Sequence, residues 1–94
     1  MIRVSVDIGF SFKRELAANY RLLVIEDGTD VRGALEALVR KHQMLRERLF
    51  DANGSIRRNI AVLANGENVV LRRGLDTPLS HGDRLTLLPP VGGG

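Results

Sequence analysis

One amphipathic helix pattern stands between two groups of strand-like segments, and this order restricts the possible fold more than any other feature. Apolar side chains recur at helical spacing from Val31 through Leu35 and Leu38 to His42, which gives the helix one apolar face. Such a face must pack against another element. Because strand patterns precede and follow it, the helix is expected to cover one face of a sheet.

The segments before the helix predict two strands. Apolar and polar residues alternate over residues 2–8, which is the period of a strand with one buried face. A second β-prone run covers residues 20–25, and a single helical turn is predicted over residues 12–16 in the loop between them. Thr29 or Asp30 can then cap the main helix by accepting hydrogen bonds from its free amides.

The segments after the helix predict a short extra helix and a hairpin. Apolar residues over 45–50 have helical spacing. The β-prone runs 60–64 and 67–71 flank the Asn65-Gly66 pair, whose tolerance of positive φ angles is the strongest short hairpin signal. We therefore expect these two runs to pair as antiparallel strands.

A last strand is predicted over residues 84–88, and it completes the order of elements. Strands on both sides of one main helix are best accommodated by a single mixed sheet whose inner face covers that helix. The predicted fold class is α+β, a β-grasp (ubiquitin-like) domain over residues 1–88 with one main helix and a short extra helix. Residues 89–94 are predicted to form an extended, flexible C-terminal tail.

The tail consists of two prolines, a valine and three glycines, ending at Gly94. Glycine has no Cβ, so its backbone can enter channels that exclude other residues, while each proline fixes φ and keeps the chain extended. A glycine-rich end is ordinarily just frayed. The stiff Pro89-Pro90 stem argues against simple fraying but does not overturn it alone, and the alternative is a tail that is threaded into the active site of another protein.

The composition provides few side chains with which the chain itself could catalyse a reaction. Cysteine is absent, and the two histidines, His42 and His81, are far apart in the sequence. No metal site is predicted, because the acidic residues lack a ligand-like spacing. The net charge is +3, but acidic residues are interspersed, which favours an ordinary solvated surface over a nucleic-acid site. No membrane span or signal peptide is predicted, so a cytoplasmic location is expected.

The C-terminal segments carry a resemblance to a known family. The ending Leu88-Pro89-Pro90-Val91-Gly92-Gly93-Gly94 resembles the Pro-Pro-Val-x-Gly-Gly ending of the MoaD/ThiS sulfur carriers. The segments 27–29, 65–67, 74–79 and 82–83 are similar to the same family. Gly92 stands at the variable position before the last two glycines. The resemblance covers nearly the whole chain and is most specific over residues 65–94.

The resemblance implies a chemistry for the C-terminus. An adenylating enzyme related to ubiquitin activators would use ATP and magnesium to convert the Gly94 carboxylate to an acyl-adenylate, and a sulfur donor such as a cysteine desulfurase would then leave a thiocarboxylate. Gly92 and Gly93 would be threaded into the partners. The chain itself would bind no cofactor, and its catalytic groups would come from those partners.

The Pro-Pro-Val ending favours the small subunit of molybdopterin synthase, whose large subunit would receive the tail. Several alternatives stay open. Related carriers serve thiamine, cysteine or thiolated tRNA synthesis, and some become attached to protein lysines. A β-grasp interaction module whose tail is never activated belongs to a different class, and a basic nucleic-acid-binding domain is a weaker alternative.

A partner surface is predicted beside the tail. If Leu85 and Leu87 point into the core, the period of a strand places Leu88 on the outer face of the sheet. Leu63 is expected to lie near it. The predicted apolar interface comprises Leu63, Leu88, Pro89, Pro90 and Val91, and Arg57, Arg58, Arg72 and Arg73 are candidates for its polar rim.

Overall fold

The computed structural model describes residues 1–8 and 22–88. Three predictions lie wholly or partly outside the described residues. They are the helical turn at 12–16, the first two residues of the predicted strand 20–25, and the tail 89–94.

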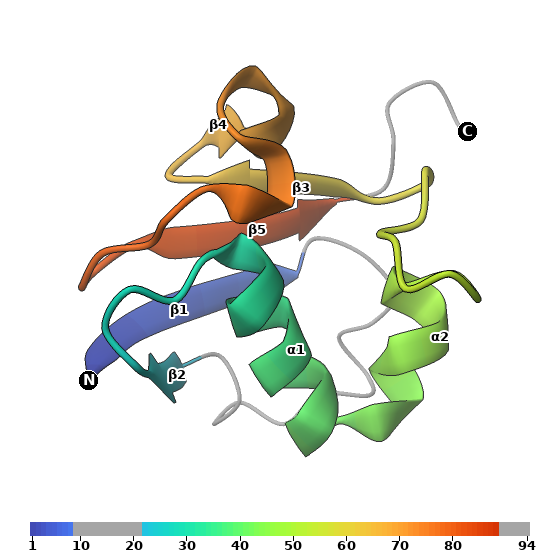
Figure 1. The fold of residues 1–94 in the computed structure, drawn as a ribbon, viewed down its shortest axis with the longest axis horizontal. Coiled ribbons are helices and arrows are strands. Elements are labelled where there is room, and N and C mark those ends of the chain that lie inside the picture. Colours follow the sequence, from blue (N-terminus) through green and yellow to red (C-terminus); the bar gives the residue numbers. More distant parts are fainter. Residues whose placement is uncertain (9–21, 89–94) are drawn as a thin grey trace.

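The described residues form one mixed sheet of five strands (Figure 1). The strand order is β2-β1-β5-β3-β4, with β1 parallel to β5 and every other neighbouring pair antiparallel. The single mixed sheet expected from the sequence is therefore present, and the parallel pairing of β1 with β5 is what makes it mixed. The strands are β1 (Ile2–Ile8), β2 (Leu22–Ile25), β3 (Ala61–Ala64), β4 (Glu67–Asn68) and β5 (Arg84–Leu88).

The helices lie on one side of the sheet, with α2 beside α1 (Figure 1). The main helix is α1 (Val31–Lys41), and the predicted short extra helix is α2 (Arg46–Leu49). The β-grasp prediction is therefore confirmed. Three short 3-10 turns complete the described elements: η3 (Gln43–Leu45), η4 (Val69–Leu71) and η5 (Gly74–Asp76).

Helix α1 begins where its capping residue allows. An Oδ1 atom of Asp30 accepts a hydrogen bond from the Gly33 amide at 2.8 Å, so Asp30, rather than Thr29, is the side-chain cap. The Thr29 hydroxyl instead donates to the Glu26 carbonyl oxygen at 2.6 Å. At the other end, His42 closes the helix as its C-terminal cap and is only half-buried. The apolar face predicted to include His42 thus ends one turn earlier.

The core lies between α1 and the sheet. Leu35 and Leu38 are fully buried, as the helical spacing predicts, and Val39 extends the same face. The inward residues of the strands alternate as expected, so that Leu85 and Leu87 of β5 are also fully buried. Leu45 and Leu49 bring η3 and α2 into the same cluster.

The Asn65-Gly66 hairpin forms, but the strand after it is shorter than predicted. Both turn residues have positive φ angles, 53° at Asn65 and 85° at Gly66, as a two-residue hairpin loop requires. Strand β4 nevertheless ends at Asn68, so the prediction of a strand continuing to residue 71 is wrong. The Asn68 side chain accepts a hydrogen bond from the Val70 amide at 3.0 Å, which turns the backbone away from the sheet.

Candidate functional site

The strand that leads into the predicted tail is the middle strand of the sheet. Strand β5 pairs with β1 on one edge and with β3 on the other, so its backbone is hydrogen-bonded on both sides. Its buried side chains, Leu85 and Leu87, anchor it to the core. The last described residue, Leu88, directly precedes Pro89 in the sequence. The fold therefore fixes the point from which the tail departs.

The two predicted interface residues within the described chain share the outer face of the sheet. Leu88 pairs with Ala61, and Leu63 pairs with Thr86, so the two leucines occupy diagonal positions on neighbouring strands. Both leucines are half-buried. The structure thus brings them together as expected, whereas the tail residues predicted to share their interface lie outside the described residues.

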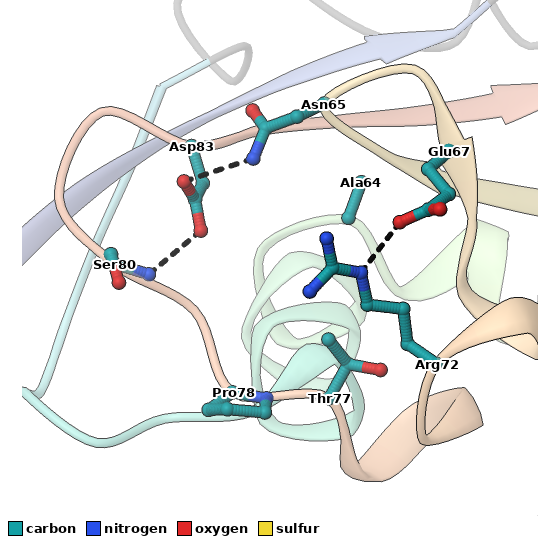
Figure 2. Close-up of a pocket in the computed structure, with 8 residues that line it drawn as sticks. All are labelled: Ala64, Asn65, Glu67, Arg72, Thr77, Pro78, Ser80 and Asp83. Atoms are coloured by element: carbon teal, nitrogen blue, oxygen red, sulfur yellow. Dashed lines mark hydrogen bonds and ion pairs between the residues drawn. The ribbon is translucent and has the colours of Figure 1, made fainter.

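A polar pocket of about 350 Å³ lies at the opposite end of β5 (Figure 2). Asp83 holds its rim in place, because its carboxylate accepts hydrogen bonds from Asn65 Nδ2 at 3.0 Å and from the Ser80 amide at 2.7 Å. Asn65 Oδ1 in turn accepts from the Arg84 amide at 3.0 Å. These bonds join the β3–β4 turn to the start of β5.

Two of the three charged side chains that line this pocket form an ion pair. The Arg72 guanidinium donates through Nε to the Glu67 carboxylate, which raises the pKa of Arg72 above its usual value (Figure 2). The start and end of β5 are about 13 Å apart at the usual rise per residue. The pocket is therefore remote from Leu88, and its hydrogen bonds set the turn and strand register rather than provide a reactive centre.

The segments that carry the family resemblance meet in space. Asp30 and Pro78 form an isolated antiparallel bridge. The Val31 amide donates to the Thr77 carbonyl oxygen, and the Leu79 amide donates to the Thr29 carbonyl oxygen, both at 3.0 Å. The segments at 27–29 and 74–79 thus hold the start of α1 against the connection that leads to β5. Their similarity to the family has a structural basis.

One exposed ion pair lies away from this site. The amino-terminal ammonium of Met1 contacts the Asp27 carboxylate at 2.8 Å and lowers the pKa of Asp27 through a hydrogen bond and charge attraction. Because the folded pKa is depressed, any stabilisation by this pair is present above the unfolded pKa and is lost as the pH falls through the folded value. Both groups are exposed, so the contribution is small.

The other candidate residues have separate places in the fold. His81 Nδ1 accepts a hydrogen bond from the Arg3 amide at 3.1 Å, which ties the turn before β5 to β1. Arg57 donates through Nε to the Glu47 carbonyl oxygen. Within residues 1–8 and 22–88, no cluster of three or more histidine, cysteine or acidic side chains could hold a metal ion. No helix in the same ranges is long and apolar enough to span a membrane.

A mixed five-stranded sheet with β5 at its centre and one covering helix defines a ubiquitin-like β-grasp domain. The sequence matches the ThiS family over residues 10–94. The chain belongs to the ThiS family, which confirms the resemblance found in its C-terminal segments.

Similar proteins fall into several named groups. Small archaeal modifier protein 1 from Haloferax volcanii is 38% identical over 86 residues, covering 90% of this chain and 94% of that protein. Its crystal structure matches with a TM-score of 0.82 at 29% identity, covering 97% of this chain and all of that chain. A chain of the BexX/CysO complex from Amycolatopsis orientalis matches at 0.75 and 26% identity, covering 97% and 99% of the two chains.

A candidate molybdopterin converting factor subunit 1 from Pyrococcus furiosus has the same fold. Its TM-score is 0.69 at 24% identity, with 97% of this chain and all of that chain covered. At this identity the likeness shows the fold alone.

Proposed function

We propose that the chain is a sulfur carrier whose Gly94 carboxylate is activated and converted to a thiocarboxylate. The observation that supports this most strongly is the position of β5. This central strand is hydrogen-bonded to a neighbouring strand on each side and ends at Leu88, six residues before Gly94. Membership of the ThiS family agrees with it. The chain has no cysteine, so sulfur cannot be held on a thiol side chain.

The chemistry follows from the properties of a carboxylate. An ionised carboxylate is a poor electrophile, so a partner enzyme must first join it to AMP from ATP, releasing pyrophosphate. Sulfide then attacks the acyl carbon and displaces AMP, which leaves the Gly94 thiocarboxylate. A persulfide attacking the same carbon gives an acyl disulfide, whose S–S bond a thiol of the partner must reduce to release the thiocarboxylate. Sulfur in this form is anionic and nucleophilic, like a thiolate. The chain supplies the carboxylate and its docking surface, while the adenylating partner binds ATP and magnesium.

Sulfur delivery to a pterin precursor is the acceptor reaction that we propose first. The Pro-Pro-Val ending supports it, since it resembles the ending of molybdopterin synthase small subunits. In this role the large subunit would take the tail into its active site, where the thiocarboxylate sulfur attacks the precursor. This chain would act as the carrying subunit, and the large subunit would provide the catalytic groups.

Attachment to other proteins is a second candidate, because a specific observation favours it. The 38% identity to small archaeal modifier protein 1 extends over 90% of the chain. The same activated carboxyl carbon could be attacked by a lysine amine instead of by sulfur, with AMP as the leaving group and an amide as the product. One activated end therefore serves both candidates.

A single reconstitution distinguishes the two candidates. The thiocarboxylated chain is incubated with a molybdopterin synthase large subunit plus pterin precursor. In parallel, the unmodified chain is incubated with its adenylating enzyme, ATP and a lysate of its own source cell. Conversion of the precursor with return of the Gly94 carboxylate supports the first candidate. Gly94 joined to lysine in peptide mass spectra supports the second. The unthiolated chain without ATP is the control for both, and failure of both reactions would contradict the proposed acceptors.

Replacing Leu88 with Asp is expected to weaken binding of the adenylating enzyme at least tenfold, because a charge would enter an apolar contact beside the tail. Affinity measured by calorimetry checks this. Val24→Asp is the matched control, because Val24 is an exposed apolar residue of β2 on the same outer face of the sheet as Leu88. Equal losses for both variants, or no loss for Leu88→Asp, would contradict a docking surface at Leu88. Unchanged melting temperatures must accompany the comparison.

A further inference from the structure

An exposed apolar pair occupies the turn that replaces the end of the predicted strand. Val70 and Leu71 in η4 are 77% and 75% exposed, the highest values among the large apolar residues of the described chain. The turn is held on both sides. Asn68 Oδ1 accepts from the Val70 amide, and the Arg72 amide donates to the Val69 carbonyl oxygen at 2.9 Å. The exposure is therefore built into the local structure.

Beside this pair runs an apolar groove of about 290 Å³. Its lining is formed by the end of the loop before β3, by β3 itself and by η4 and η5. Strand β4 covers β3 only at Leu63 and Ala64, which leaves the preceding part of β3 open to the groove. The apolar side chains in the lining that matter here are Ile56, Ile60, Val69, Val70 and Leu75.

The unpaired charges around the groove are positive, because Glu67 and Asp76, which adjoin lining residues, form salt bridges with Arg72 and Arg32. Arg58 is exposed and lines the groove, and no carboxylate does. Arg73, also exposed, directly precedes Gly74 of the lining. Within the part of the chain that the structure describes, neither arginine forms a salt bridge, whereas the charge of Arg72 is compensated by Glu67. An apolar groove beside uncompensated guanidinium groups is complementary to apolar side chains accompanied by carboxylates.

We propose that this groove binds an acidic, amphipathic segment of a partner protein. The apolar side chains of that segment would pack on Val70, Leu71 and Leu75, while its carboxylates would pair with Arg58 and Arg73. Because the η4 turn is already ordered by hydrogen bonds, binding requires little further ordering of this surface. The site does not depend on the sulfur chemistry. The groove lies beside the last described residue, since Ala61 of the lining pairs with Leu88, so one partner could contact both the groove and Leu88.

A peptide titration tests this proposal directly. The probe is a synthetic 14-residue peptide of alternating Leu-Leu and Glu-Glu pairs, added to the ¹⁵N-labelled full chain, and the control peptide has Lys in place of Glu. We expect saturable amide shifts confined to residues 56–62 and 68–75 with the acidic peptide and at least tenfold weaker binding of the basic one. Equal binding of both peptides, shifts centred on Leu63 and Leu88, or no saturable shifts would overturn the proposal.

Two variants separate apolar from charge contacts. The double variant Val70→Ser with Leu71→Ser, and the variant Arg58→Glu, are each expected to weaken acidic-peptide binding at least tenfold. These residues are exposed, so the fold should be retained, which unchanged amide spectra outside the groove would verify. The matched control, Leu22→Ser with Val24→Ser on β2, should bind as the parent does. Equal loss in the control would overturn the assignment.

Sedimentation tests whether a second copy of the chain occupies the groove instead of a partner segment. If the chain forms a dimer that the Val70/Leu71 variant abolishes, the groove belongs to that dimer interface and the proposal is overturned.

Discussion

Deleting Gly94 is expected to abolish thiocarboxylate formation, with at least a hundredfold loss of rate in the presence of the adenylating enzyme, ATP and sulfide. The shortened chain still has a C-terminal carboxylate, but that group lies roughly 3.5 Å short of the position reached by the Gly94 carboxylate. A displacement of about 1 Å can already cost a hundredfold in rate. The rate of AMP release and the intact mass of the product are the measurements.

The fold must survive this deletion for the result to be informative. Gly93 and Gly94 have no side-chain atoms to bury, so the melting temperature of the shortened chain is expected to match that of the parent. A second variant extends the chain by a phenylalanine after Gly94, which keeps the glycine in place but blocks its carboxylate. It should be equally inactive until a protease restores the glycine end. Normal sulfur loading by either variant, left unprocessed, would contradict a reactive Gly94.

Replacing Leu38 with Ala is expected to reduce the free energy of unfolding by about 2 to 5 kcal/mol. Leu38 is fully buried in the cluster between α1 and the sheet. Its removal loses transfer free energy and leaves a cavity that the neighbouring side chains cannot fill completely. Urea titration followed by circular dichroism measures the change.

Val70→Ala is the matched control for this prediction. It also removes methyl groups from an apolar side chain, but Val70 is 77% exposed, so the expected change is within about 0.5 kcal/mol. A loss below about 1 kcal/mol in Leu38→Ala, or equal losses in both variants, would contradict the placement of Leu38 in the core.

Much of the fold could be predicted because its signals are local. The alternation over residues 2–8 and the spacing of Leu35 and Leu38 depend only on which side chains face the core, and the structure buries those side chains. The Asn65-Gly66 hairpin is equally local, since these residue types tolerate the positive φ angles that the turn requires. These features predicted the order of elements and the β-grasp arrangement.

The features that were not predicted depend on competition between local structures or on long-range contacts. Residues 69–71 have high β propensity, but the side chain of Asn68 offers the Val70 amide a hydrogen bond that ends the strand. An asparagine directly before that run was the signal that could have revealed the turn. The bonds of Asp83 to Asn65 and Ser80 join residues up to 18 positions apart, and only the tertiary structure brings them together.

The candidate interface also has one part that could be predicted from the sequence and one part that could not. The outer position of Leu88 follows from the period of β5, and the structure places Leu63 diagonally across from it. The arginines predicted as a rim for this pair do not act as one set. Arg57 and Arg72 bind groups of their own chain, while Arg58 and Arg73 flank the groove beside η4. Side-chain pairing of this kind depends on loop geometry, which the charge pattern alone does not determine.

The mass of the C-terminal peptide tests the central proposal most directly. The full chain is incubated with its cognate adenylating enzyme, magnesium, ATP and sulfide, digested, and compared with a reaction lacking ATP. Exchange of one oxygen for sulfur at Gly94 predicts a gain of about 16 Da, confined to the peptide that ends at Gly94 and dependent on ATP. An unchanged mass in the presence of an enzyme that loads another carrier, or a gain located elsewhere in the chain, would contradict it.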